Sequence, residues 1–120
     1  MSSPFSEILE RLVAAVPGVI GAVFADWEGE PVDQFSKQAV DEIQILGAQL
    51  GVTMSQINGA LKRLGAGRAE ELWIEGDRAV YFLVKVTDAY FVVLFGKPGV
   101  NLGRVRKLMK AAVVALRDEM

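Results

Sequence analysis

Residues 43–61 read IQILGAQLGVTMSQINGAL, a run of 19 residues without a single charge. Apolar residues recur in and just beyond this run at the spacing of one face of an α-helix: Ile43, Leu46, Leu50, Met54, Ile57, Leu61 and Leu64. A helix on the surface of a soluble protein normally shows a charged face to water. Because this run has none, we expect one of its sides to lie on the chain's own core and the other against a partner.

The residues around the run predict a helix over residues 37–64, about 40 Å long at about 1.5 Å per residue. Asp41 and Glu42 lie near its start, and Lys62 and Arg63 lie at its end. Both placements suit the helix macrodipole. Gly65 follows as a typical C-terminal stop.

A row of small residues runs beside the apolar stripe: Gly47, Gly51, Ser55 and Gly59, with Ala48 and Val52 alongside. Each glycine inside a helix costs about 0.5–1 kcal/mol relative to alanine. Such a row can form a groove into which another element settles closely. A neighbouring element of the same chain is one candidate for this groove. We favour the same helix of a second copy, because each of the other two predicted helices has its own stripe for the opposite sheet face.

Outward from this helix, the upstream residues predict a helix and two strands. Ser3 and Pro4 fit an N-cap followed by proline at the first helical position, and Pro17-Gly18 ends the helix. Residues 19–25 predict a buried strand and residues 26–30 a turn. Residues 31–36 predict a second strand, placed at a sheet edge by its first residue, a proline.

Downstream, three strands are predicted as a meander, over residues 70–75, 79–86 and 89–96. The last two are apolar on both alternating faces, which is typical of strands covered on both sides. Asn101 caps a last helix. The order α-β-β-α-β-β-β-α over residues 1–120 predicts one α+β domain. We expect a five-stranded antiparallel sheet with two helices on one face and the long helix on the other.

The composition excludes several kinds of functional site. The 120 residues include neither cysteine nor histidine, and the net charge is −2. Disulfides, Cys-type zinc sites and histidine bases are therefore excluded, and nucleic-acid binding by bulk charge is not expected. We see neither a signal peptide nor a stretch of ~18 purely apolar residues. These features predict a cytoplasmic, non-enzymatic protein with no cofactor, no metal and no stable membrane insertion.

Three further patterns favour ordinary surface structure over a site. The acidic residues Asp26, Glu28, Glu30 and Asp33 lack calcium-loop spacing and fit a solvated turn. Residues 96–103 lack the order of a phosphate loop. The last helix is basic, through Arg104, Arg106, Lys107, Lys110 and Arg117. A solvated face is the favoured interpretation of that helix, and an acidic partner or membrane headgroups are the alternative.

Two tryptophans are candidate contact residues. Trp73 points opposite to Leu72 and Ile74 on its predicted strand, and it is either part of the core or an interface anchor. Trp27 lies in a turn, where we expect it to be partly exposed and available to a partner. Gln44 and Gln56, polar residues of the uncharged run, are further candidates for partner binding.

The segment Val16-Pro-Gly-Val-Ile-Gly-Ala-Val-Phe-Ala-Asp-Trp-Glu-Gly-Glu-Pro-Val32 resembles the opening of roadblock-family proteins. These comprise the dynein light chains called roadblock and the bacterial MglB-type regulators of small Ras-like GTPases. The family pattern is V-P-G-V, then G-A-x-x-x-D, then a d-G-x-x-V turn. It falls here on residues 16–19, on Gly21, Ala22 and Asp26, and on Gly29 and Val32. The order of elements also matches, so the resemblance spans essentially the whole chain. The motif indicates a profilin/longin-like fold rather than an activity.

The resemblance implies a homodimer in which the long helix pairs with its mate and the strand at residues 70–75 pairs edge to edge. The expected interface is Gly47, Ala48, Gly51, Val52, Ser55, Gly59, Leu72, Trp73 and Ile74. It also implies binding to a small Ras-like GTPase, in polarity- or motility-type signalling, without supplying a catalytic residue. The longer gliding regulators carry a C-terminal extension, which we do not expect here. The alternative is a scaffold that binds other roadblock proteins or a motor complex.

Overall fold

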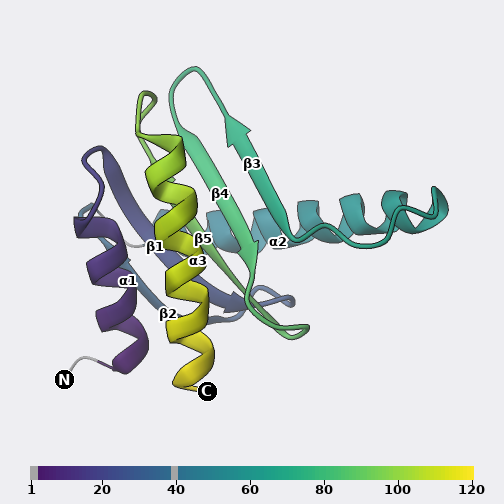
Figure 1. Cartoon of the computed structure of the whole chain (residues 1–120), viewed down its shortest axis with the longest axis horizontal. Coiled ribbons are helices and arrows are strands. Elements are labelled where there is room, and N and C mark those ends of the chain that lie inside the picture. Colours follow the sequence, from purple (N-terminus) through teal and green to yellow (C-terminus); the bar gives the residue numbers. More distant parts are fainter. Residues whose placement is uncertain (1–2, 39–40) are drawn as a thin grey trace.

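The computed structural model describes residues 3–38 and 41–120, and their elements follow the predicted order (Figure 1). The helices are α1 (Pro4–Ala14), α2 (Asp41–Arg63) and α3 (Leu102–Asp118). The strands are β1 (Val19–Asp26), β2 (Pro31–Ser36), β3 (Glu71–Glu75), β4 (Val80–Lys85) and β5 (Tyr90–Gly96). The predicted start of the long helix, at residue 37, is wrong. The backbone N–H of Lys37 still donates to Ile20 of β1, so this residue continues the sheet.

The sheet is antiparallel, with the strand order β2-β1-β5-β4-β3. The predicted edge position of β2 is therefore confirmed, and β3 forms the other edge. β1 and β5 lie next to each other in the middle and pair over most of their length, from Val19–Gly96 to Asp26–Tyr90. Residues 91–94 of β5 are buried on both faces, as the apolar sequence predicts, whereas Tyr81 of β4 and Phe95 of β5 are only half-buried.

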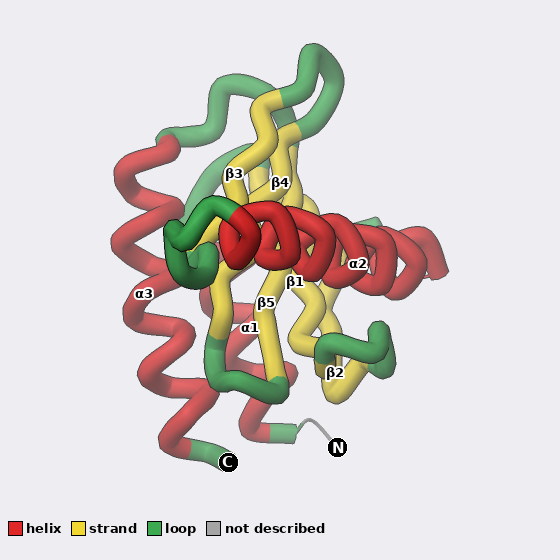
Figure 2. The backbone as a smooth tube through the Cα atoms, turned by 90° about the vertical axis from the view of Figure 1, so that its right-hand side faces the viewer, coloured by secondary structure: helices red, strands yellow, loops and turns green. Residues whose placement is uncertain are grey.

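Helices cover the two faces of the sheet unequally. α1 and α3 lie side by side on one face, and α2 crosses the other face alone (Figures 1 and 2). This confirms the predicted layers. The first face buries a large core that includes Leu9, Phe24 and Phe82. The second buries a smaller one, which includes Ile43, Met54, Leu83 and Phe91.

Local chemistry sets the ends of several elements. The Ser3 hydroxyl accepts the N–H of Ser6 at the start of α1, and the Asn101 side chain accepts the N–H of Arg104 at the start of α3. In the β1–β2 turn the Asp26 carboxylate accepts the N–H groups of Glu28 and Glu30, both at 3.0 Å. These bonds satisfy donors that would otherwise be unpaired.

Candidate interaction surface of α2 and β3

The inward side of α2 is buried only along the first part of the helix. Ile43, Leu50 and Met54 are buried, as the apolar stripe predicts. Farther along, Ile57 and Leu61 are half-buried, and Leu64, just after the helix, is 78% exposed. α2 packs mainly on β1, β2 and β5, and its C-terminal part extends past β3 beyond the edge of the sheet (Figure 1). The apolar stripe is thus longer than the sheet beneath it.

The small residues of α2 do not all face where the sequence suggests. A Cβ on Gly47 would lie 2.8 Å from Cγ1 of Val23, and one on Gly51 would lie 3.0 Å from Cζ of Phe91. Both glycines are buried. The prediction that they form a groove for a second copy is therefore wrong, because their own sheet occupies the space that they leave. Close packing of a helix on a sheet is sufficient reason for glycine at both positions.

The other small residues of α2 also lie next to parts of their own chain. Ala48 lies beside the β1–β2 turn, where a Cβ on Gly29 would approach its Cβ to 3.0 Å. Ser55 and Gly59 line a cavity together with Trp27 and with Lys85 of β4. The small-residue row thus faces the chain's own sheet, the β1–β2 turn and this cavity.

The outward side of α2 is uncharged and exposed between Ile45 and Gln56. Ile45 is 60% exposed and Val52 is 57% exposed, and Gln49 and Gln56 between and after them are exposed as well. We call Ile45, Gln49, Val52 and Gln56 the outward stripe. Gln44 lies to one side of it, half-buried, with its amide donating to Gln34 at 2.8 Å. Of the two glutamines singled out from the sequence, only Gln56 presents an exposed side chain.

A second apolar surface lies beside α2. Ile74, Tyr81 and Phe95 are neighbours across β3, β4 and β5. They face α2 but remain half-buried. We call these three residues the apolar row. Tyr81 and Phe95 line a hollow of about 200 Å³ together with Leu46 of α2.

The outer edge of β3 carries backbone N–H and C=O groups that do not bond to β4. Glu70 accepts the N–H of Lys85, and Gly76 donates to Ala79, so even-numbered residues of this strand bond to β4. Hydrogen bonding alternates along an antiparallel pair. The N–H and C=O groups of Glu71, Trp73 and Glu75 therefore point away from β4, toward the open edge.

Trp73 lies on the opposite sheet face from Leu72 and Ile74, as its strand position predicts. Its ring meets Phe82 edge to face, with 5.1 Å between centroids. The guanidinium of Arg106 in α3 lies 5.7 Å from the Trp73 ring centroid, and its Nε lies 3.4 Å from a Glu71 carboxylate oxygen. The half-buried tryptophan is thus held at the β3 edge by contacts within the chain.

The remaining sequence candidates have mainly structural roles. The ring of the half-buried Trp27 packs on Phe91 at a centroid distance of 4.6 Å. The acidic turn serves to bind backbone N–H groups through Asp26. Within residues 3–38 and 41–120, acidic side chains do not gather in a group that could hold a metal ion. In the same part of the chain, every helix is too short or too polar to cross a membrane.

Comparison with known proteins decides the family. The family model described as "Roadblock/LC7 domain" matches residues 5–95. The chain belongs to the Roadblock/LC7 family. The predicted recognition is therefore confirmed. Comparison of the roadblock chain with curated protein sequences finds no match.

Solved structures agree on the roadblock fold. A Roadblock/LC7 domain from Streptomyces avermitilis is 18% identical with a TM-score of 0.87, and the match covers 94% of each chain. MglB from Myxococcus xanthus is 17% identical with a TM-score of 0.83, covering 95% of this chain and 92% of that one. MglC from the same organism is 24% identical with a TM-score of 0.69, covering 98% and 100%. Profilin II of Acanthamoeba castellanii, at 13% identity and a TM-score of 0.66, shares the architecture over 93% of this chain and 95% of that one.

Sequence reasoning missed the apolar row and the cavity lined by Ser55 and Gly59. The alternating pattern of β4 and β5 does place Tyr81 and Phe95 on one face. It does not reveal that the crossing helix leaves this part of the face only half-covered. That follows only from the angle at which α2 crosses the sheet.

Proposed function

We propose that this roadblock protein is a non-enzymatic, cytoplasmic homodimer that binds a small Ras-like GTPase and influences its nucleotide state or location. The observation that carries the dimer is the mismatch between α2 and its sheet. The C-terminal part of α2 projects past the edge at β3 (Figure 1). In this part of the helix Ile57 and Leu61 are only half-buried, and Leu64, which follows the helix, is exposed. On the same sheet face, the apolar row is left half-covered.

A two-fold axis beside β3 would cover both the projecting part of α2 and the apolar row. It would place the overhanging part of each α2 over the apolar row of the other chain, with the helices antiparallel. The contact sides would then include Leu46, Thr53 and Ile57 rather than the small-residue row. Such an interface is self-complementary, as a two-fold requires.

The β3 edge supports the same axis. The outward N–H and C=O groups of Glu71, Trp73 and Glu75 would pair with the β3 of the second chain. An exposed edge strand invites such pairing. Leu72 and Ile74 would lie on the α2 side of the junction and Trp73 on the α3 side. An MglB structure with a tetrameric arrangement, 19% identical to this chain, is consistent with self-association in the fold.

The outward stripes of two adjacent α2 helices would form one uncharged platform. It combines exposed apolar side chains, Ile45 and Val52, with the amides of Gln49 and Gln56. We propose this platform as the GTPase-binding surface. Resemblance to MglB-type regulators supports the choice of partner, and the absence of cysteine and histidine from the sequence favours regulation without catalysis.

The dimer is tested by Leu64→Glu with Val114→Glu as the matched control. Leu64 is 78% exposed and Val114 of α3 is 57% exposed, so neither change should disturb the fold. A carboxylate at residue 64 would be buried against the partner's sheet, which is costly. We expect Leu64→Glu to weaken the dimer at least about tenfold, or about 1.4 kcal/mol, in light scattering over a dilution series. A wild-type monomer at micromolar concentration, or equal effects of both changes, would contradict the dimer.

GTPase binding is tested with candidate Ras-like GTPases loaded with GDP or a GTP analogue. We expect the wild-type chain to retain one loaded form preferentially, and Val52→Glu to lose it while remaining dimeric. Absence of binding in both states, with an intact dimer, would favour the alternative. In that case the protein is a scaffold for other roadblock proteins or a motor complex, and a pull-down with a roadblock partner would replace the GTPase assay.

A further inference from the structure

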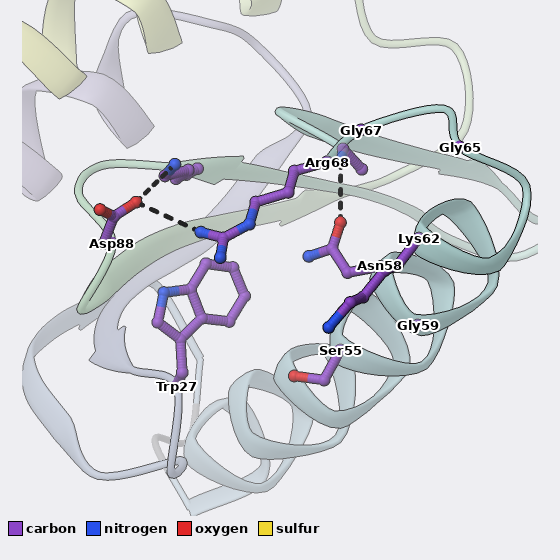
Figure 3. A pocket seen from close by; sticks show the side chains of 11 residues that line it. Trp27, Ser55, Asn58, Gly59, Lys62, Gly65, Gly67, Arg68 and Asp88 are labelled. Atoms are coloured by element: carbon purple, nitrogen blue, oxygen red, sulfur yellow. Dashed lines mark hydrogen bonds and ion pairs between the residues drawn. The ribbon is translucent and has the colours of Figure 1, made fainter.

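A cavity of about 640 Å³ lies on the other flank of α2 from the apolar row (Figure 3). The C-terminal part of α2 forms one wall, and the α2–β3 loop, the β1–β2 turn and the β4–β5 turn form the others. Its volume is in the range of small-molecule sites. The flank of α2 that faces it carries Ser55, Asn58, Gly59 and Lys62, which are not part of the proposed pairing contacts.

The α2–β3 loop is shaped to bring an arginine over this cavity. Gly65 and Gly67 have positive φ values of 67° and 83°, a conformation that favours glycine. Asn58 of α2 then accepts the N–H of Ala69 through its side-chain oxygen, at 2.8 Å. This bond ties the returning loop to the helix. Arg68 lies between these fixed points and extends across the cavity toward Trp27 and Asp88 (Figure 3).

The cavity carries more positive than negative charge, although the whole chain has a net charge of −2. Lys62, Arg68 and Lys85 line it together with one carboxylate, that of Asp88. Asp88 lies 2.8 Å from Nζ of Lys85 and 3.7 Å from Nη1 of Arg68. Across the described residues, Lys62 forms no salt bridge to a carboxylate. The arrangement leaves cationic donors available for an anion.

The indole ring of Trp27 forms a planar surface on one side of the cavity. It packs on Phe91 within the chain and lines the cavity across from Lys62, with the Arg68 side chain reaching toward the ring (Figure 3). Ser55 and the amide of Asn58 add neutral polar groups nearby. An aromatic plane beside cationic donors suits a ligand that joins a planar ring to a phosphate.

We propose that this cavity binds a phosphate-bearing ligand with a planar ring, of the nucleotide class. Lys62 and Arg68 bind the phosphate groups, Trp27 contacts the ring, and Ser55 and Asn58 form hydrogen bonds with the polar edge of the ligand. This site goes beyond the proposed dimer and its GTPase, and rests on neither. Binding is reversible and involves no covalent step.

The test uses ADP as the probe, without metal. In a Trp73→Phe chain, Trp27 is the remaining tryptophan of the sequence, so its fluorescence reports on the cavity. We expect saturable quenching by ADP that weakens as salt is added, since charge–charge contacts are screened. Calorimetry on the unmodified chain measures the same binding without the Trp73 change. Pyrophosphate and adenosine, each lacking one half of ADP, are expected to bind more weakly.

Lys62→Gln and Arg68→Gln are each expected to reduce ADP affinity about tenfold, as for loss of one charge-assisted contact. Lys107→Gln, an exposed lysine of α3, is the charge-matched control and should leave affinity unchanged. No saturable binding, adenosine or pyrophosphate binding as tightly as ADP, or equal loss with Lys107→Gln would overturn the proposal. The oligomeric state is measured alongside, so failure here is distinguishable from failure of the dimer.

Discussion

Two glycines of α2 differ in what a methyl group would meet. A Cβ on Gly47 would lie 2.8 Å from Cγ1 of Val23, whereas one on Gly59 would meet only Nη1 of Arg63, at 3.7 Å. Valine is stiff about χ1 and cannot easily turn away, but an arginine end can. The same substitution should therefore have opposite signs at the two sites.

We expect Gly47→Ala to destabilise the fold by about 1–3 kcal/mol through overpacking. Gly59→Ala should stabilise it by up to about 1 kcal/mol through helix propensity. Urea unfolding at a single protein concentration measures both. A stabilising Gly47→Ala would show that α2 can move off Val23 freely, and a destabilising Gly59→Ala would place an unseen contact at Gly59.

Asp88 makes a pH-dependent contribution at the edge of the cavity. A hydrogen bond and the charge of Lys85, with a smaller effect of Arg68, lower the pKa of its carboxyl below the usual 3.8. A group with a lowered folded-state pKa contributes stability that is fully present above its unfolded pKa and lost as pH falls through the folded one. The contribution is small, because the side chain is 81% exposed.

The stability difference between wild type and Asp88→Asn should therefore be constant near neutral pH and shrink below about pH 4. Urea midpoints across a pH series measure it. Asp88→Asn should also tighten ADP binding at neutral pH, because it removes the negative charge facing Lys85 and Arg68. A difference that persists unchanged into strong acid would mean that the carboxylate does not act through its charge.

At the scale of elements, the β3 edge predicts that proline is tolerated at alternate positions. The N–H of Glu75 points away from β4, so Glu75→Pro removes a donor that the fold of one chain does not use. We expect little change in the unfolding free energy of the monomer and clear loss of the dimer by light scattering. Glu75→Gln, which keeps the N–H, should leave both unchanged. If Glu75→Pro remained dimeric, pairing through β3 would be wrong.

How much of each element was predictable depends on what its residues contact. The stripe from Ile43 to Leu64 identified α2 and its inward side, because apolar spacing alone encodes a helical face. The contact of Gly47 with the sheet could not be predicted from apolar spacing. A helical wheel places it beside the stripe but does not say that Val23 of the sheet reaches that far. Likewise Tyr81 and Phe95 read as core residues, and only the crossing of α2 leaves them half-covered.

At the scale of the whole molecule, the proposed two-fold couples folding to association. Ligands and partners that bind only the folded chain stabilise it by mass action, and a second copy does the same. The thermal midpoint should therefore rise with protein concentration for the wild type. For Leu64→Glu the midpoint should be lower than that of the wild type at each concentration in the same range, because the weakened dimer is less populated, which calorimetry can measure. A concentration-independent wild-type midpoint would argue against association.

Because α2 projects past the sheet, a small tilt of the helix displaces its C-terminal end by a larger distance. One end is seated on the sheet through Gly47 and Gly51, and the other end projects past β3 (Figure 1). A small tilt at the seated end is magnified at the free end, which in the proposed dimer lies on the partner's sheet. Larger side chains at Gly47 or Gly51 would therefore change the angle between the two protomers of the proposed dimer. They would do so although neither residue lies in the interface between the protomers.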